Sequence, residues 1–514
     1  MLVGDILKKS AARAPERLAL IGRGRRLTYA EFEQAANRLA HALLGLKLEK
    51  GANVAILSSN RPEYAIAYFA IARTPYVSAH LSTRSIASEL EYVLNRIDAK
   101  VIFFEASHAN LITEILPQLE TRPLLIALDK TSDIDGATFI DDFAAGFPGG
   151  QPEIDIEETD SLAITLTGGT TGLPKAVLVS HRARSASAIA AKEEFGLDAD
   201  DIVIASTPLF HAAGLFVWFG TAVMQGATVV LPPAWDAAEF MKIVESEKVT
   251  AAFLVPSQLN DLISHRDFSA EKLKTLKNIG FAGAPMSRAL FDRVQSLLPH
   301  VAFTENYGQS EACPITIRPP GVTDEKLGTV GKAACNAEIG IVDTNGNLLP
   351  AGEIGDVVTR GDQLFDEYLN DPEETKAAFS LDGGWLLTGD VGFIDDDGFL
   401  TLVDRSKDML VSGGENVYPA EIENVLYQHE AVAECAVFGI PDERWGEVPA
   451  AHIVLSPGVS VSEKNLIDFC ATKIARFKRP RIVKFVNMLP KTPVGKIRKN
   501  DLRQPYWSDK KKNV

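Results

Sequence analysis

The segment 165–175 brings glycines, threonines and a closing Lys175 together, and it reads Thr-Leu-Thr-Gly-Gly-Thr-Thr-Gly-Leu-Pro-Lys directly after an apolar run. Backbone N–H groups of such a loop can approach a polyphosphate closely, because glycine has no Cβ to block the approach. The threonine hydroxyls can bond phosphate oxygens or a bound cation, and the lysine supplies a compact positive charge. Taken alone, the same composition also fits a turn that only reverses the chain. The segment therefore predicts a phosphate-binding loop that other residues must support.

The composition is that of an ordinary globular chain. Of its 514 residues, 46% are hydrophobic and 23% are charged, no apolar run reaches the roughly 18 residues of a membrane span, and the N-terminus lacks a secretory pattern. The net charge of −16 argues against a general nucleic-acid binder, but loops and helix N-termini can still hold an anionic nucleotide. We therefore expect a cytoplasmic enzyme with no stable membrane span. Reduced thiols are expected at Cys313, Cys335, Cys435 and Cys470, which lack metal-type spacing.

Short β-branched runs alternate with helix-like stretches through most of the chain. Apolar residues recur at spacings of three and four in 29–44 and 289–298, as in helices. Such alternation predicts an α/β fold with largely parallel sheets covered by helices. The expected strands of this part are 53–57, 101–104, 124–128, 161–165, 202–206, 228–231, 251–255 and 301–304.

The sequence changes character near residue 340. Segments 354–360 and 386–403 are typical of paired strands, and Asp395-Asp396-Asp397-Gly398 predicts a turn between two of them. A compact stretch with the pattern of a small α+β domain follows, so we place a domain boundary at 404–408. The elements expected in that stretch are strands near 434–439, 450–455 and 481–486 and a helix near 462–475.

Five further motifs accompany the glycine-rich segment. They are Asn-Tyr-Gly-Gln-Ser-Glu at 306–311, Leu-Thr-Gly-Asp at 387–390, Asp-Arg-Ser-Lys-Asp at 404–408, Ser-Gly-Gly-Glu-Asn at 412–416 and Pro-Val-Gly-Lys at 493–496. In this order and at these distances, the set resembles the signature of AMP-forming acyl- and aryl-CoA synthetases. These enzymes belong to the adenylate-forming superfamily, together with luciferase and peptide-synthetase adenylation domains. The resemblance runs from about residue 10 to 504. A Walker-type loop and a dinucleotide-binding loop do not fit, because their closing and spacing residues are missing.

The resemblance implies a domain organisation. A large N-terminal domain, 1–404, would hold stacked, mostly parallel sheets covered by helices, with a small β-barrel-like subdomain at about 335–404. Residues 405–408 would form a hinge centred on Lys407. Residues 409–514 would form a small, mobile α+β lid domain.

The resemblance also implies a two-step reaction. A carboxylate attacks the α-phosphate of ATP to give an acyl-adenylate and pyrophosphate, and the thiol of coenzyme A then displaces AMP. Such a reaction needs positioning and charge neutralisation more than covalent help. Gly168 departs from the family pattern, which usually has serine there, so one hydroxyl contact is lost while the backbone donors remain. The residues implied to cradle the β- and γ-phosphates are Thr167, Gly168, Gly169, Thr170, Thr171, Gly172 and Lys175.

The remaining nucleotide contacts follow from the same resemblance. Glu311, with Thr170, would hold Mg²⁺ against the phosphates, as hard oxygen ligands suit that ion. Asp390 would accept hydrogen bonds from the ribose hydroxyls, and Arg405 would reach the ribose or a phosphate. The alternatives are a solvated surface acid for Glu311, core packing for Tyr307 and a surface turn for Asp390. The adenine would lie against Tyr307, in the Asn306-Tyr307-Gly308 run, with Gly283, Ala284 and Pro285 along its edge.

Lys496 would be the lysine that serves adenylate formation. Its motif can present a long cation to the α-phosphate and the substrate carboxylate, although a lysine near a basic C-terminus is otherwise often a solvated charge. The coenzyme A thiol must reach the same carbonyl, so Lys496 has to leave, which the family achieves by rotation about the hinge at Lys407. In the rotated state Ser412, Gly413 and Gly414 would line the pantetheine tunnel.

A basic cluster with an aromatic residue, Phe477-Lys478-Arg479-Pro480-Arg481, resembles the coenzyme A nucleotide site of aryl-CoA ligases. Phe477 would stack on adenine, and Arg479 or Arg481 would pair with phosphate, with Trp445 on the same face. The alternative is a basic rim beside a packed phenylalanine.

The acyl pocket implied by the family is apolar apart from His211 and the metal-site residues. Such a lining disfavours malonate and amino acids, because a second charge on the substrate would need a buried counter-charge. His211 resembles the histidine or aromatic residue that gates the family's pocket, and its alternative is an ordinary buried histidine. We expect a hydrophobic monocarboxylic acid, and aromatic and fatty acids both remain open. The implied lining residues are His211, Ala212, Leu215, Phe216, Phe281, Ala282, Gly308 and Gln309.

The function predicted from the sequence is an ATP-dependent carboxylic acid:CoA ligase that uses Mg²⁺ and coenzyme A. The alternatives are an adenylate-forming enzyme with a different second step, either luciferase-like or loading a carrier protein, and a nucleotide-binding relic. The intact Glu311, Asp390, Arg405 and Lys496 argue against the relic. The sequence does not set the oligomeric state and leaves a homodimer open.

Overall fold

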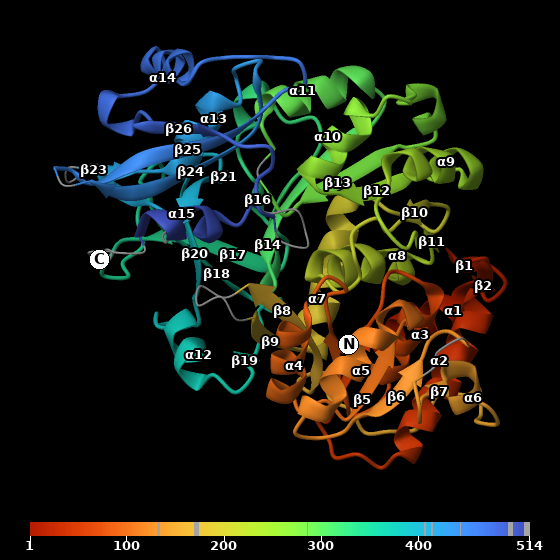
Figure 1. The fold of residues 1–514 in the computed structure, drawn as a ribbon. Coiled ribbons are helices and arrows are strands. Elements are labelled where there is room, and N and C mark those ends of the chain that lie inside the picture. Colours follow the sequence, from red (N-terminus) through yellow and green to blue (C-terminus); the bar gives the residue numbers. More distant parts are fainter. Residues whose placement is uncertain are drawn as a thin grey trace.

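A computed structural model describes residues 1–130, 134–168, 174–284, 286–405, 408–412, 415–442, 444–491 and 497–507. Its fold is the expected α/β arrangement, in which mostly parallel sheets are covered by helices. The chain runs from the N-terminal sheets to a smaller C-terminal part, drawn in blue in Figure 1. Within the described ranges, no helix is long and apolar enough to cross a membrane.

One sheet of the described chain has eight strands in the order β19-β9-β8-β4-β3-β5-β6-β7. Alternate residues of β3 face opposite sides: Val54 and Ile56 join one core, while Ala55 and Leu57 join another. The first core is shared with helices α1 (Gly4–Arg13), α2 (Tyr29–Gly45) and α3 (Pro62–Ile71), and the second is covered by α4 (Ala87–Arg96) and α5 (Ala109–Ile115). The strands are β3 (Asn53–Leu57), β4 (Val77–His80), β5 (Val101–Phe104), β6 (Leu124–Ala127), β7 (Thr138–Phe139), β8 (Ser161–Gly168), β9 (Pro174–Ser180) and β19 (Glu367–Tyr368), and the short helix α6 (Ile140–Phe143) follows β7.

A second sheet, with nine strands among the described residues, has the order β16-β15-β14-β13-β12-β10-β11-β1-β2. Its face with Val203 and Phe253 contributes to the core shared with the first sheet, whereas Ile204 and Leu254 face helices on the outer side. Those outer helices are α9 (Ala237–Glu247), α10 (Pro256–Ser264) and α11 (Arg288–Leu297). The strands are β1 (Leu18–Gly22), β2 (Arg25–Thr28), β10 (Ile202–Ile204), β11 (Thr228–Val230), β12 (Ala251–Leu254), β13 (Asn278–Ala282), β14 (Ala302–Gln309), β15 (Ala312–Arg318) and β16 (Lys332–Ala333).

Between the two sheets lie helix α7 (His181–Phe195), the π-helical segment η3 (Ala213–Phe219) and α8 (Gly220–Gln225). Helix α7 begins after Ser180, whose hydroxyl accepts the N–H of Ala183, and ends at Gly196, where φ is +61°. A left-handed residue of this kind is a common helix stop, and glycine adopts it without a Cβ penalty. Most side chains of α7 are buried between the sheets, although Arg182 and Ile189 are exposed.

Two antiparallel sheets complete the described chain. The sheet β17-β18-β20-β21 follows the large sheets, and the order β23-β22-β25-β24, with β26 beside β25, forms the C-terminal part. The elements are β17 (Ala337–Val342), β18 (Gly355–Gly361), α12 (Pro372–Ala378), β20 (Leu386–Ile394), β21 (Leu400–Arg405), β22 (Leu410–Ser412), β23 (Glu415–Val417), α13 (Pro419–Leu426), β24 (Val432–Asp442), β25 (Gly446–Leu455), α14 (Glu463–Ala471), β26 (Ile482–Phe485) and α15 (Lys499–Trp507).

The predicted elements agree with these bounds to within a few residues at most ends. The largest difference is at β14, which ends at Gln309 instead of residue 304. In the glycine-rich segment, β8 continues to Gly168 instead of ending at Thr165. These residues pair antiparallel with β9, from Thr165 opposite Val177 to Gly168 opposite Pro174. The predicted loop is therefore shorter than the motif, because cross-strand hydrogen bonds outweigh the low strand propensity of glycine.

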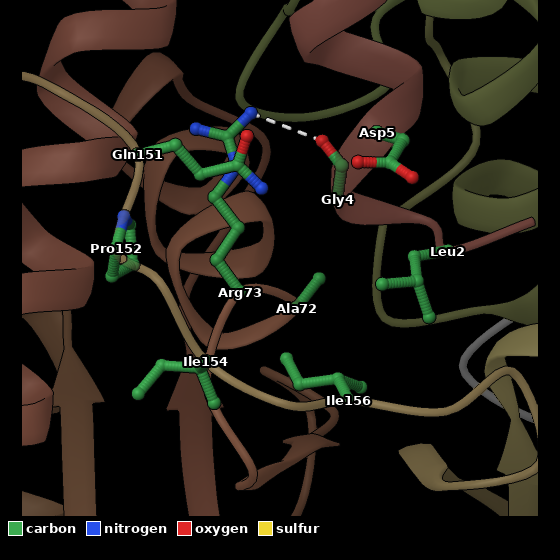
Figure 2. Close-up of a pocket in the computed structure, with 9 residues that line it drawn as sticks. All are labelled: Leu2, Gly4, Asp5, Ala72, Arg73, Gln151, Pro152, Ile154 and Ile156. Atoms are coloured by element: carbon green, nitrogen blue, oxygen red, sulfur yellow. Dashed lines mark hydrogen bonds between the residues drawn. The ribbon is translucent and has the colours of Figure 1, made fainter.

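The N-terminal helix is tied to the large core by a buried arginine. Arg73 donates from Nη2 to the carbonyl oxygen of Gly4 at 3.0 Å, as Figure 2 shows. A cavity of about 20 Å³ lies beside this contact, and Gln151 is among its lining residues. That volume suits about one water molecule, and the buried Arg73 Nε and Gln151 Oε1 have no hydrogen-bond partner of their own. None of the lining residues belongs to the predicted site.

Candidate active site

The hairpin of β14 and β15 carries two of the predicted site residues, Tyr307 and Glu311. Strand β14 pairs in parallel with β13 and antiparallel with β15, so the hairpin lies where the parallel sheet gives way to an antiparallel edge. Its pairing is irregular between Tyr307 and Gln309, which is typical of a bulge that redirects side chains. The hairpin thus presents Tyr307 and Glu311 to two different groups of partners.

The first group surrounds Asp390, which is 5% exposed. Tyr307 donates its hydroxyl proton to Asp390 Oδ2 at 2.6 Å, and Arg405 Nε lies 3.2 Å from Asp390 Oδ1. Asp390 and Arg405 are directly opposite each other on β20 and β21. Gly389 has φ of +73°, a conformation that other residues rarely adopt, and it precedes this carboxylate. Three residues predicted for the nucleotide site are therefore joined by direct contacts.

The phenol of Tyr307 is a stable donor in this group. Burial, followed by the negative charge of Asp390, raises its pKa well above the usual value. A carboxylate oxygen offers about two acceptor positions, so Asp390 can accept a further hydrogen bond at each oxygen after binding Tyr307 and Arg405. The arrangement suits a ligand with two neighbouring hydroxyl groups.

The second group surrounds Glu311, which is 8% exposed. Tyr368 donates its hydroxyl proton to Glu311 Oε1 at 2.7 Å. Lys175 lies over the ring of Tyr368, with Nζ 4.8 Å from the ring centroid, and Nζ pairs with Glu374 Oε2 at 2.7 Å. Burial, followed by the charge of Glu311, raises the pKa of Tyr368, so this phenol also stays protonated. The lysine that closes the glycine-rich segment and the predicted metal carboxylate therefore both contact Tyr368.

His211 lies in a tight turn at the start of η3. Its backbone N–H donates to the carbonyl oxygen of Pro208 at 3.1 Å, and the centroid of its ring lies 4.6 Å from that of the Phe210 ring. A Cβ at Gly214 would come within 2.5 Å of the Pro208 carbonyl oxygen, so only glycine fits this turn. The other predicted acyl-pocket residues are mostly buried and apolar: Ala212, Leu215, Phe216, Phe281 and Ala282 are buried, while Gly308 and Gln309 are intermediate.

The other described nucleotide residues flank these groups. Asn306 is buried and precedes Tyr307 on β14, and Gly283 follows β13 with φ of +87°. Ala284 is partly buried next to it, and Thr167 is partly buried near the end of β8. Because β13 and β14 are neighbours in the sheet, Gly283 and Ala284 lie along the same edge as Tyr307, whereas Thr167 belongs to the other large sheet.

The predicted coenzyme A residues of the C-terminal part have mixed surroundings. Phe477 packs against the core of that part, and Arg479 donates to the carbonyl oxygens of Ile474 and Ala471. Trp445 and Arg481 are exposed, and both lie near Asp442, whose pKa is lowered by the backbone N–H groups of Trp445 and Arg444 and by nearby charges that include Arg481. Ser412 is buried on β22. The packed phenylalanine of the alternative interpretation is thus observed, alongside two exposed side chains.

The chain around 404–408 makes a defined contact with the C-terminal part. Asp404 Oδ2 accepts the N–H of Ala420 at 2.9 Å, and its Oδ1 accepts the N–H of Arg405 at 2.7 Å. Lys499 pairs with Glu423 at 2.8 Å on the same side. Strand β21 and helix α13 are therefore linked at the position of the predicted boundary.

Several predicted site residues lie outside the described residues. They are Gly169, Thr170, Thr171, Gly172, Pro285, Lys407, Gly413, Gly414 and Lys496. Gly168 is described only as the last residue of β8.

Sequence reasoning missed Tyr368, Glu374 and Arg184. Tyr368 belongs to the two-residue strand β19, which reaches the site by pairing with β9, so no local pattern marks it. Arg184 is 1% exposed, although it lies in a His-Arg-Ala-Arg-Ser run that is typical of an exposed helix face. In the part of the chain that is described, no group of three or more histidine, cysteine, aspartate or glutamate side chains could hold a metal ion by itself.

Comparison with known protein families gives two matches. A family model described as AMP-binding enzyme matches residues 7–369. A second, described as AMP-binding enzyme C-terminal domain, matches residues 421–496.

Individual proteins are similar along nearly the full chain. The long-chain-fatty-acid–CoA ligase FadD13 of Mycobacterium tuberculosis is 33% identical over 507 residues, which are 98% of each chain. The feruloyl-CoA synthase of an Amycolatopsis species is 32% identical over 499 residues, covering 97% of this chain and 98% of that one. A crystal structure of the anthranilate CoA ligase AuaEII with anthranoyl-AMP superimposes with a TM-score of 0.91 at 29% identity, covering 98% and 97% of the two chains.

Proposed function

This chain belongs to the AMP-binding enzymes, the adenylate-forming family of acyl-CoA synthetases, and from that membership we propose how its residues act. The enzyme is an ATP-dependent carboxylic acid:CoA ligase that forms an acyl-adenylate and releases pyrophosphate and AMP. ATP and coenzyme A are its co-substrates. The observation that carries the assignment of roles is the hairpin of β14 and β15, which joins the Tyr307–Asp390–Arg405 group to the Glu311–Tyr368–Lys175 group.

Asp390 binds the ribose hydroxyls of ATP. Its carboxylate is held in place by Tyr307 and Arg405, which supports the role because both partners leave acceptor positions open. The ring of Tyr307 lies against the adenine, next to Asn306 and Gly308, and Gly283, Ala284 and Pro285 line its edge. The β- and γ-phosphates lie in the segment from Thr167 to Lys175, where the N–H donors and Lys175 neutralise their charge.

Glu311 and Thr170 hold Mg²⁺. The fit rests on the buried carboxylate of Glu311, a hard oxygen donor that Tyr368 orients from one side. When bound, the ion supplies charge neutralisation at the phosphates. Mg²⁺ is usually held by few protein carboxylates and by substrate phosphates, which agrees with the single carboxylate here.

Lys496 binds the α-phosphate and the substrate carboxylate during adenylation. It then withdraws when residues 409–514 rotate as a lid about Lys407, within the hinge 405–408, relative to the domain 1–404 and its β-rich part from about 335. The hydrogen bond from the Ala420 N–H to Asp404 crosses this boundary, so the rotation has to break it or carry Asp404 along. In the rotated state coenzyme A passes Ser412, Gly413 and Gly414, with Trp445, Phe477, Arg479 and Arg481 at its nucleotide.

The acid is a hydrophobic monocarboxylic acid. Support comes from the buried, apolar walls around η3 and β13, which favour an apolar body, and from relatives that act on fatty, feruloyl and anthranoyl groups. His211 lies just before the N-terminal end of η3, where it gates the pocket. We also place the enzyme in the cytoplasm, where ATP and coenzyme A are both supplied. A homodimer stays a prediction, which size-exclusion chromatography tests.

Pyrophosphate release tests the function. We expect purified protein with ATP and Mg²⁺ to release pyrophosphate only with certain hydrophobic acids, and to form the acyl-CoA and AMP when coenzyme A is added. Light emission or oxygen uptake would indicate a luciferase-like second step, and transfer to a carrier protein without coenzyme A would indicate loading. If no acid in a panel of fatty and aromatic acids elicits pyrophosphate from folded protein, the ligase assignment fails.

Glu374 competes with the phosphates of ATP for Lys175. We expect Glu374→Ala to lower KM for ATP by about two- to five-fold, since a partly exposed ion pair contributes about 0.2–1 kcal/mol and its loss frees the lysine. Initial rates of pyrophosphate release at varied ATP measure this change. Glu373→Ala, at the exposed neighbouring position, should leave KM unchanged. An unchanged or raised KM in Glu374→Ala would contradict the competition.

A further inference from the structure

Arg184 is a buried arginine that forms no ion pair with any residue that the structure describes. Its side chain on α7 is among the largest fully buried ones, at 1% exposure. Nη1 donates to Cys313 Sγ at 3.0 Å and to Ser187 Oγ at 3.3 Å, and Nη2 donates to the Ser310 carbonyl oxygen at 2.7 Å. Nε is buried and has no hydrogen-bond partner within the described ranges. The guanidinium therefore keeps at least one N–H donor unused in the interior.

No carboxylate neutralises this charge among the residues that the structure describes, because none forms an ion pair with Arg184. Burial raises the pKa of the Asp366 carboxyl, and the positive charge of Arg184 lowers it by less. His80, which shares Phe216 and Tyr68 as neighbours, is neutral, because burial lowers its pKa to about 3. A buried charge is usually retained only with a partner, so the missing partner requires an explanation.

The guanidinium contacts two segments that carry residues predicted to line the acyl pocket. It is 4.8 Å from the ring centroid of Phe216, on η3. Its two hydrogen bonds to Ser310 and Cys313 reach the β14–β15 hairpin beside Gln309. Gly308 packs on the same cysteine, since a Cβ added to Gly308 would lie 3.2 Å from the Cys313 Cβ. The charge thus lies beside Phe216 and the hairpin turn, which are predicted to line the acyl pocket.

We propose that Arg184 selects the acid, by donating from Nε–H to an oxygen acceptor on the end of the substrate remote from its reacting carboxylate. The inference rests on the proposed ligase function and amends the substrate given there, to an apolar acid with a distal carbonyl or hydroxyl oxygen or with a second carboxylate, for which Arg184 supplies the buried counter-charge. Such an oxygen supplies the missing partner, and hydrogen bonds to charged groups are among the stronger ones. A site built to bind such an oxygen discriminates against the analogue that lacks it.

Matched acids test the proposal. Octanoate is compared with 7-oxooctanoate and octanedioate, and 3-phenylpropanoate with its 4-acetyl and 4-carboxy derivatives, by pyrophosphate release. We expect the wild-type kcat/KM to be about 10- to 100-fold higher for at least one oxygen-bearing acid than for its hydrocarbon parent. The ketone and carboxylate arms show whether the acceptor is neutral or anionic. No preference in either series overturns the proposal, whereas no pyrophosphate with any acid overturns the ligase function itself.

Variants at two arginines of α7 separate selection from structure. Arg184→Met should remove the preference for the oxygen-bearing acid while changing kcat/KM for the parent acid and KM for ATP by less than about three-fold. Arg182→Met, at the exposed position two residues earlier, should retain the preference. An equal loss for all acids in Arg184→Met, with an unchanged thermal midpoint, would show that Arg184 only positions the hairpin. If Arg184→Met does not fold, the preference of the wild-type enzyme for the oxygen-bearing acids over their parent acids alone decides whether the proposal holds.

Discussion

Asp390→Asn is expected to lower kcat/KM for ATP by about 100-fold, which corresponds to about 2.7 kcal/mol. Asparagine keeps the size of the side chain but removes the charge that Arg405 approaches at 3.2 Å and one oxygen that accepts a hydrogen bond. Each hydrogen bond to a charged group contributes about 1.5–3 kcal/mol, so the loss of ribose contacts should dominate. Initial rates of pyrophosphate release at varied ATP measure the effect.

A smaller change at the same group provides the control. Tyr307→Phe keeps the ring beside the nucleotide and the charge of Asp390, and it removes only the 2.6 Å hydrogen bond. We expect a fall of about five- to ten-fold in kcat/KM for ATP, with KM for the acid unchanged in both variants. A change confined to KM for the acid would contradict the ribose role of Asp390.

Lys496→Ala is expected to reduce adenylate formation by at least about 10²–10³-fold, as for other preorganised groups that stabilise developing charge. Thioester formation from a preformed acyl-adenylate and coenzyme A should remain within a few-fold of wild type, because the lysine has left the site in that step. The two half-reactions are measured separately, by pyrophosphate release and by consumption of synthetic acyl-adenylate.

Lys491 is a suitable control, because it precedes the same motif and pairs with Glu434 at 2.6 Å. Lys491→Ala should leave both half-reactions unchanged. Equal losses of both half-reactions in Lys496→Ala would contradict the rotation about Lys407. That result would leave the adenylation site itself intact, since Asp390 and Glu311 are tested independently.

Local patterns predicted many of the strands, a few helices and part of the candidate site. Alternating strand and helix patterns located β3, β5 and α2 almost to the residue, because each has its own apolar period. The Tyr307–Asp390–Arg405 group was predictable from the family motifs, and the structure joins its three members by direct contacts.

Residues brought in by distant pairing could not be predicted. Tyr368 reaches Glu311 because β19 pairs with β9, whose sequence lies far away. Arg184 is buried because α7 is enclosed between two sheets, whereas its own neighbours His-Arg-Ala-Arg-Ser are typical of a solvated surface. Burial of a helix face is a tertiary property that composition does not determine. The sequence therefore predicts an uncharged acyl lining, because nothing in it indicates that Arg184 is buried next to that lining.

The hairpin of β14 and β15 restricts how acid preference can diverge within this lineage. Tyr307 and Glu311 stand four positions apart in the sequence, so an inserted residue between them would separate the nucleotide contact from the metal carboxylate. Gly308 cannot be enlarged either, since a Cβ there would lie 2.9 Å from the Ala312 carbonyl oxygen. New acid preferences should therefore arise as substitutions on η3 and α7, and homologues should differ there in side-chain size and charge while the length of this turn stays constant.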